Sequence, residues 1–316
     1  LLYDVTTYFS TATVLRFGAA DNDSAPDAAF LTGNRNLEKV GLGTLNIAGT
    51  TSYTGETLVN GGRLTANGSL LSSSGVTVGV DGTLGGTGFV PSTVVMGALA
   101  PGNSIGTIAV VGNLTFTAGS AYQVEVAGVA NDRTNVTGTA TLGGTAQATY
   151  SGTSFTRAPN TILSATGGLA GRFQNHTAQG LPSFLFSSLG YGTTDVTISL
   201  QSGMASISGL GGNQGAVARA FDTAFNAGAG LNGVPGLYGL SAGQIPQALT
   251  VLSGESTSVT QTSAFAAGQQ FTSTMTGRAT TRRSDELACA ERTDQPAACE
   301  VPQWSAWTLG FGGTQS

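Results

Sequence analysis

Charged residues are scarce in this sequence. Asp, Glu, Lys and Arg make up 9% of the 316 residues, and the formal net charge is −5. In soluble globular proteins these four residue types make up about a quarter of the chain. Hydrophobic residues still reach 40%, unlike the charge-rich, apolar-poor composition of disordered chains. The sequence is therefore expected to bury a core of useful size.

Basic residues and histidine are scarcer still. Lys39 is the one lysine, His176 is the one histidine, and eleven arginines are scattered along the chain. So few cations cannot line a groove that follows a phosphate backbone, which excludes nucleic acid as a partner. His176 has no recognisable Ser and Asp partners and is expected to be an ordinary loop histidine. We expect no catalytic residue, no cofactor and no metal in this chain.

Long apolar runs are also missing. No stretch of 18 consecutive apolar residues occurs, so no membrane-spanning helix is predicted. The sequence starts at Leu1, without Met and without a signal-peptide pattern. This start favours a processed or excised piece of a longer protein.

Cysteine is limited to Cys289 and Cys299, ten positions apart near the C-terminal end. This spacing favours a disulfide that closes a small loop in an oxidising compartment. Two free thiols are the alternative. A metal site is less favoured, because two thiolates without a nearby histidine supply too few ligands for zinc.

Glycine is abundant, with 48 residues, and a Gly-x-Leu pattern recurs between residues 43 and 114. The leucines of successive copies are separated by 19, 20, 15 and 15 positions. The recurrence predicts an all-β solenoid, in which each leucine points inward and stacks on the leucine of the next turn. These stack leucines are Leu45, Leu64, Leu84, Leu99 and Leu114.

The segment 97–126 shows how such strands would follow one another. Period-two patterns predict short strands over 107–111, 114–116 and 122–126. The sequence Pro-Gly-Asn-Ser at 101–104 interrupts the pattern, because Pro fixes φ and Gly or Asn tolerates a positive φ. We interpret it as a corner between two turns of the coil.

Beyond residue 204 the periodicity becomes helical. Val217, Phe221 and Phe225 recur at every fourth position and predict an amphipathic helix over 213–227. A glycine-rich break follows, and then a second short amphipathic segment over 245–252. Residues 253–278 are a longer helical candidate, weakened by Thr, Ser and Gly.

Three motifs in the first half resemble a known family. The runs Lys39–Leu45, Tyr53–Gly55 and Asn60–Leu64 are similar, in order and spacing, to the passenger-associated repeat of bacterial autotransporters, the proteins of type V secretion. The resemblance implies a right-handed parallel β-helix, in agreement with the Gly-x-Leu recurrence. Further on, 171–200 resembles the closing β-helix segment of that family, which acts as an intramolecular folding aid.

The C-terminal third resembles the membrane-proximal part of the same family. The run from Ala248 to Glu255 is similar to a motif that leads into the helix inside the outer-membrane barrel. By that resemblance, Glu255 and Arg278 would contact the barrel lumen. Trp304 and Trp307 lie in an alternating run similar to the first barrel strand, where they would belong to the aromatic girdle at the membrane interface.

These observations divide the chain into five predicted parts. Residues 1–35 are a β/loop lead-in, and 36–149 are the β-helix with the repeat. Residues 150–203 are a cap resembling the family's autochaperone, and 204–300 are a helical linker. Residues 301–316 are the first strand of an outer-membrane β-barrel that is otherwise absent. The predicted fold class is all-β, a right-handed parallel β-helix followed by a short helical linker and this strand.

The resemblance also implies a function. The chain would be the C-terminal passenger or stalk segment of a Gram-negative autotransporter, supporting folding and display of an upstream passenger. It would lie at the outer membrane or cell surface, with the passenger either retained or released outside the cell. Its partners would be the outer membrane and the barrel-assembly machinery, and also host cells or other bacteria, as for virulence factors.

Other functions stay open. The chain could be the stalk of a secreted subtilisin-like serine protease whose catalytic domain lies upstream, or part of a β-helical adhesin. An unrelated secreted β-solenoid is a further alternative. In none of these cases is the segment itself expected to be an enzyme.

Overall fold

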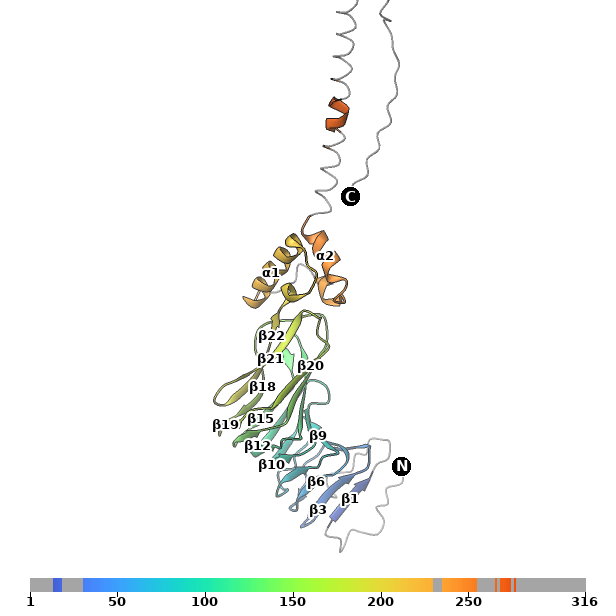
Figure 1. Cartoon of the computed structure of the whole chain (residues 1–316). Coiled ribbons are helices and arrows are strands. Elements are labelled where there is room, and N and C mark those ends of the chain that lie inside the picture. Colours follow the sequence, from blue (N-terminus) through green and yellow to red (C-terminus); the bar gives the residue numbers. More distant parts are fainter. Residues whose placement is uncertain are drawn as a thin grey trace, which may run out of the picture. The chain divides into compact units, whose positions relative to one another are not determined.

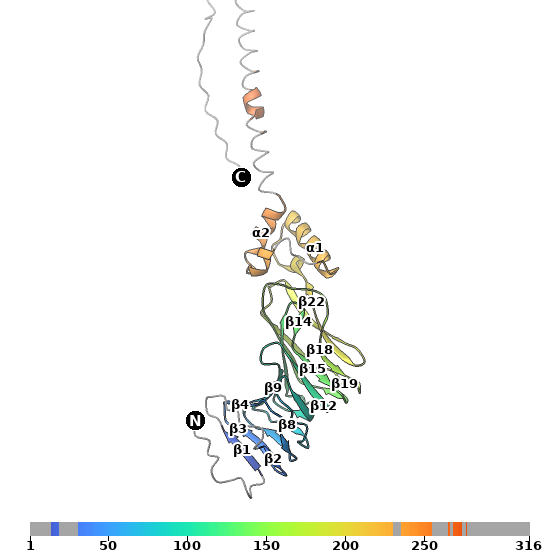
Figure 2. The same cartoon turned by 180° about the vertical axis from the view of Figure 1, so that it is seen from behind.

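The computed structural model describes residues 14–18, 31–229, 235–254, 265, 268–273 and 276. It divides by compactness into two units, Leu1–Leu249 and Thr250–Ser316. The first unit carries all the described strands and is the part seen as stacked arrows in Figures 1 and 2.

Two sheets dominate the first unit, and we call them sheet A and sheet B. Sheet A runs in the order β1 (Val14–Gly18), β3 (Asn36–Val40), β6 (Thr57–Val59), β8 (Val76–Val78), β10 (Phe89–Val95), β12 (Thr107–Phe116), β15 (Arg133–Val136), β18 (Asn160–Ala165), β22 (Asp195–Ser202) and β21 (Leu185–Tyr191). Two short strands join beside this path, β16 (Ala140–Leu142) and β19 (Leu169–Gly171).

Sheet B consists of the strands that the chain forms between those of sheet A. Its order is β4 (Thr44–Ile47), β7 (Gly62–Ala66), β9 (Gly82–Gly86), β11 (Ala98–Pro101), β13 (Ala121–Ala127), β17 (Thr145–Tyr150) and β20 (Asn175–Gln179). The short β14 (Ala130–Asn131) pairs with β13, and β2 (Thr32–Gly33) pairs with β5 (Ser52–Tyr53).

The chain alternates between the two sheets as it advances. From β3 to β13, apart from the short β5, strands of sheet A and sheet B follow each other in turn, and every pairing between successive strands of one sheet is parallel. Successive strands of the same sheet therefore lie side by side in space (Figure 1). This arrangement confirms the predicted parallel, β-rich organisation and is consistent with a solenoid.

The predicted leucine stack is confirmed for four of its five members. Leu45, Leu64, Leu84 and Leu99 are paired in direct register on neighbouring strands of sheet B, and all four are fully buried. The next position in that column is Tyr122. Sheet B thus builds one inward column, as the recurrence predicted, but an aromatic ring replaces leucine at its fifth level.

Leu114 is the exception, and its placement in the stack was wrong. Leu114 is buried, but it lies on β12 in sheet A, where it pairs with Thr93 and Ala140. The reason is that 107–116 forms one strand and not two. Gly112, with φ of +127°, keeps the chain within sheet A, and the pairing register shifts at the opposite position, between Pro91 and Thr93.

The segment Pro101–Ser104 is a corner, as predicted. Strand β11 ends at Pro101, and Gly102 takes a φ of +79°, so glycine and not Asn103 supplies the left-handed conformation. An isolated antiparallel bridge joins Gly102 to Gly86 of the preceding turn. The corner is thereby tied to the strand beneath it.

The described stack ends with a change of strand direction. Strand β22 pairs antiparallel with β18, and β21 pairs antiparallel with β22. A 3₁₀ turn, η2 (Met204–Ser206), follows, and then helix α1 (Gly212–Asn226), a second 3₁₀ turn η3 (Pro235–Gly239), and helix α2 (Ile245–Leu252). The helices predicted over 213–227 and 245–252 are therefore confirmed.

Among the described residues, no helix is both long and apolar enough to cross a membrane. Of the helical candidate over 253–278, Ser253 and Gly254 form a turn, and the other described positions, Phe265, 268–273 and Thr276, are helical. The lead-in before Val14 and the run 301–316 lie outside the described residues.

Candidate functional site

The first candidate region is the closing segment, 150–203. Its aromatic and aliphatic residues were identified from their similarity to a folding-aid segment, and the structure buries them. Phe184, Val196 and Ile198 are at most 1% exposed, and Phe173 is 7% exposed. Alternation along β22 directs its apolar side chains inward. The hairpin β21–β22 thus extends sheet A past β18, its last parallel strand, and keeps the apolar side chains of β22 in the core.

Two polar residues of α1 hold the end of that hairpin. The Asp222 carboxylate accepts hydrogen bonds from the Ser202 hydroxyl (2.6 Å) and from the backbone N–H groups of Met204 (2.7 Å) and Ala205 (2.9 Å). One turn later, the Asn226 amide accepts from the Ser202 N–H and donates to the Ser202 carbonyl, both at 2.9 Å. Positions four apart share one helix face, so this face of α1 satisfies the backbone where β22 ends.

An aromatic cluster fills the space beside this contact. The Phe184 ring meets Phe221 of α1 edge-on, with centroids 5.6 Å apart, and stacks on Tyr238 of η3 at 6.1 Å. Tyr238 also contacts Phe155, at 5.0 Å. Such pairs contribute about 0.5–1.5 kcal/mol each beyond burial. Helix α1 and the turn η3 are therefore packed onto the closing segment by specific ring contacts.

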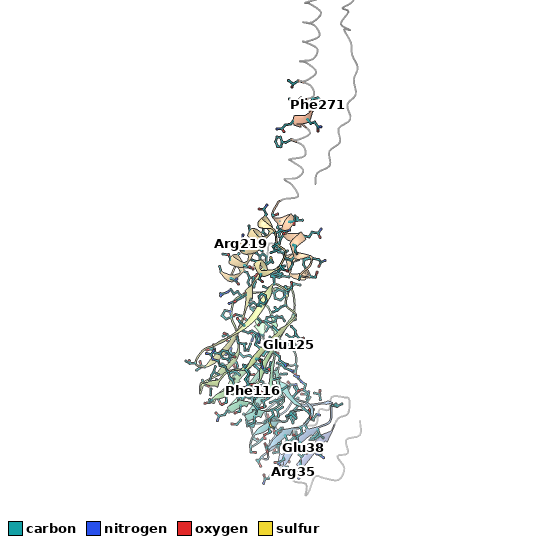
Figure 3. The ribbon with its side chains drawn as sticks, viewed as in Figure 1. Arg35, Glu38, Phe116, Glu125, Arg219 and Phe271 are labelled. Carbon is teal, nitrogen blue, oxygen red and sulfur yellow. The ribbon has the colours of Figure 1, made fainter. Side chains whose placement is uncertain are left out.

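The second candidate region is a groove of about 420 Å³ on sheet B, which we call the polar groove. Its floor is made by outward-facing side chains of β13, β17 and β20, and its wall is the corner 101–104. Glu125, labelled in Figure 3, lies on this floor. The floor residues form two columns in register, Gln123–Gln147–Thr177 and Glu125–Thr149–Gln179.

Arg63 and Asp132 hold the wall of the groove from two sides. The Arg63 guanidinium donates from Nη2 to the carbonyls of Ala100 (3.2 Å) and Gly102 (3.0 Å). The Asp132 carboxylate accepts from the N–H groups of Gly106 and Glu125, both at 2.8 Å. Asp132 is 2% exposed, and burial raises the pKa of its carboxyl to about 6, although the two N–H donors act in the opposite sense.

The repeat motifs that suggested the family place two polar side chains in the core. Lys39 is fully buried, and its ammonium donates to the carbonyls of Val40 (2.7 Å), Gly41 (3.0 Å) and Gly61 (3.1 Å). Burial lowers the pKa of Lys39. The Tyr53 hydroxyl is 2.6 Å from the Thr57 hydroxyl, which in turn is 2.9 Å from that of Ser73. Both motifs are thus structural parts of the coil.

His176 lies on strand β20 and not in a loop, which corrects the prediction. Its Nδ1 is 3.1 Å from the Ala146 carbonyl, and its Nε2 is 2.8 Å from the Ser187 hydroxyl. The Ser187 hydroxyl also meets the Tyr150 hydroxyl at 2.8 Å. Since Nδ1 faces a backbone carbonyl instead of a carboxylate, this contact is not a Ser–His–Asp triad. Burial lowers the pKa of His176.

A further pattern, Gly-Asn-Ser-Ile-Gly at 102–106, has the spacing of a nucleophile elbow and was not recognised in the sequence. The structure explains why it is not one. An elbow lies between a strand and a helix, whereas this segment lies between strands β11 and β12. His176 hydrogen-bonds Ser187 and not Ser104. The segment instead contributes Gly102, Asn103 and Ser104 to the wall of the polar groove.

The remaining predicted site residues fall beyond the part of the chain that the structure describes. They are Cys289, Cys299, Trp304, Trp307, Glu255 and Arg278. Their roles remain predictions. Within the described ranges, no group of three His, Cys, Asp or Glu side chains could hold a metal ion.

The fold thus defines a parallel β-rich protein whose last described strands form an antiparallel hairpin held against helix α1. No protein-family model matches the chain. An extracellular serine protease of Serratia marcescens is 33% identical to it over 210 residues, which covers 61% of this chain and 20% of that protein. The chain therefore spans about one fifth of the length of this relative.

Proposed function

We propose that this chain is the C-terminal passenger, or stalk, segment of an outer-membrane autotransporter, and that it folds as a right-handed parallel β-helix. The alternation of parallel strands between sheets A and B supports the coil. Crossovers between parallel strands are right-handed in nearly all proteins, which supports the handedness. In this proposal the segment supports the folding and surface display of a passenger at the outer membrane or outside the cell.

The observation that carries the proposal is the closing hairpin. A stack of parallel strands leaves an open end, and open sheet edges invite unwanted pairing. Here β22 and β21 add to that end in the antiparallel sense, and Asp222 and Asn226 fix the hairpin to α1. A closed, firmly held end is what a segment needs to fold first and then template the strands before it.

The proposal is tested by unfolding the cap within the whole protein. Phe184→Ser removes a fully buried ring, whereas Phe186→Ser, two residues away, alters a ring that is 53% exposed. We expect Phe184→Ser to leave the upstream passenger sensitive to protease added outside the cells, while Phe186→Ser behaves as wild type. Equal resistance in both variants would overturn the proposed folding role.

A second candidate is that the passenger upstream is a secreted serine protease, with this chain as its stalk. The similarity to an extracellular serine protease favours this over an adhesin. A fluorophosphonate probe, which labels activated serine nucleophiles, applied to the whole protein distinguishes the two. Labelling upstream of Leu1 supports the protease, and absence of labelling on a correctly displayed protein supports the adhesin.

The proposed partners follow from the proposed autotransporter function. They are the outer membrane and the barrel-assembly machinery, which would act on a barrel continuing from 301–316, and host cells or other bacteria for the displayed passenger.

A further inference from the structure

The proposed role in passenger folding and surface display does not account for the polar groove. A stalk needs inward-facing leucines and sheet edges whose backbone groups are hydrogen-bonded. Neither requires a walled groove of about 420 Å³ on the outer face of sheet B. The groove lies on β13, β17 and β20, of which β20 is the last strand of that sheet.

The floor offers planar polar groups at regular spacing. Gln123, Gln147 and Thr177 form one column, and Glu125, Thr149 and Gln179 form the next. Strands in a sheet are about 4.8 Å apart, so three strands cover about 10 Å, the length of a disaccharide. Each glutamine amide has both a donor and an acceptor, which is the combination that two adjacent hydroxyl groups require.

The floor is also ordered before any ligand arrives. The Gln123 side-chain amide donates to the Gln147 side-chain oxygen at 3.1 Å, which aligns the two amides along the column. Both residues line the groove. A pre-ordered amide loses less conformational entropy on binding than a free one.

The wall is held by several hydrogen bonds. Asn103 donates to the Asn67 side-chain oxygen (2.9 Å), Gly106 donates to Asp132 (2.8 Å), and the Gly102 carbonyl accepts from Arg63. These contacts come from three different strands or loops. The corner 101–104 and the adjoining Gly106 are therefore held in place beside the floor of the groove.

The charges select against other ligand classes. The carboxylates of Glu125 and Asp132 both line the groove and disfavour an anion, while the Nη2 of Arg63 already has two carbonyl acceptors. Both Asp132 oxygens accept N–H bonds and the residue is 2% exposed, so it supports the wall and cannot serve as a catalytic acid. A neutral hydroxyl-rich ligand, bound without cleavage, fits best.

We propose that the polar groove is a binding site for a neutral oligosaccharide, with Gln123 and Gln147 as its principal hydrogen-bonding residues. Glu125 accepts a further hydroxyl at the neighbouring column, and the 101–104 corner forms the side against which the sugar chain lies. This site is independent of the proposed role in folding and display, since its residues face outward from the coil.

Saturation-transfer NMR on the full chain tests this proposal. The probes are maltotetraose, cellotetraose, mannotetraose and chitotetraose, with tetragalacturonate as the anionic comparison. We expect saturation transfer to at least one neutral probe and a loss of affinity of about 10-fold or more in the double variant Gln123→Ala/Gln147→Ala, which removes two hydrogen-bonding amides. Thr149→Trp, which fills the groove, should have the same effect.

Gln201→Ala is the matched control, because Gln201 is an exposed strand glutamine on β22, outside the groove. It should bind as wild type, and circular dichroism should show that all variants keep the wild-type fold. The proposal is overturned if no neutral probe binds, if binding is unchanged in the groove variants, or if tetragalacturonate alone binds.

Discussion

The side chain of Asn226 and the backbone of Ser202 form a reciprocal pair, in which the amide accepts from the Ser202 N–H and donates to its carbonyl, each at 2.9 Å. The side-chain amide makes the two backbone hydrogen bonds that a neighbouring strand would otherwise make. The backbone N–H and carbonyl of Ser202, the last residue of β22, are thereby hydrogen-bonded by a helix residue and not by a neighbouring strand. The end of the sheet and helix α1 are thereby joined by hydrogen bonds.

Asn226→Ala tests this relationship. Leaving two partly buried backbone groups without partners should lower the free energy of unfolding by about 1–3 kcal/mol. Hydrogen exchange at the amides of Ser202, Met204 and Ala205 should accelerate, because the contact with α1 loosens. Thr223→Ala, on the exposed side of the same helix, serves as control and should change stability by no more than about 0.5 kcal/mol. Equal effects of the two substitutions would contradict the assignment.

Lys39 should matter more to stability than an exposed ion pair. Lys39→Met keeps much of the volume but leaves the carbonyls of Val40, Gly41 and Gly61 without their donor, at an expected cost of about 1–3 kcal/mol. In Arg16→Ala the lost ion pair with Glu38 involves an arginine side chain that is 66% exposed, and the cost should be about 0–1 kcal/mol. Urea unfolding followed by circular dichroism compares them. The reverse order of effects would show that Lys39 is not structurally important.

Gly85 makes room for Arg63 to reach the wall of the polar groove. A Cβ at Gly85 would collide with the Arg63 guanidinium and lie 2.7 Å from the Ala100 carbonyl oxygen. Gly85→Ala should therefore displace the guanidinium and lower stability by about 1–3 kcal/mol. Gly119→Ala, where a Cβ has nothing within 4 Å, should be tolerated. A melting temperature for Gly85→Ala equal to that of Gly119→Ala would refute this account.

His176 allows a direct test of pH dependence, because it is the one histidine in the chain. Burial lowers its pKa in the folded state below the ordinary value of 6.5. The unfolded chain then binds the proton more readily, so stability is complete above about pH 6.5 and falls as the pH drops through the folded-state pKa. The imidazole chemical shifts should titrate below pH 6.5, and His176→Phe should remove this component of acid destabilisation. A titration midpoint at or above 6.5 would be inconsistent with the buried, neutral imidazole.

The local pattern was sufficient where each element depends on its own residues. The helices over 213–227 and 245–252 were predicted from apolar spacing, and the column Leu45–Leu64–Leu84–Leu99 was predicted from a recurrence. Both succeed because burial of a periodic apolar face dominates the local free energy. The same reasoning misplaced Leu114, because whether a strand continues through a glycine or turns at it depends on the neighbouring strand, here on the register shift at Pro91.

The sequence by itself determined the strand-rich repeat, the corner at Pro101–Ser104 and the helices over 213–227 and 245–252, because periodicity, proline and glycine act over a few residues. Only the tertiary structure decided the polar groove and the hold on the closing hairpin. Arg63 meets a carbonyl 39 positions away, and Ser202 meets Asn226 at a separation of 24. Such contacts depend on which turns of the chain become neighbours, and no local pattern encodes them. The physical reason is that a buried polar group is stabilised only by its actual partner.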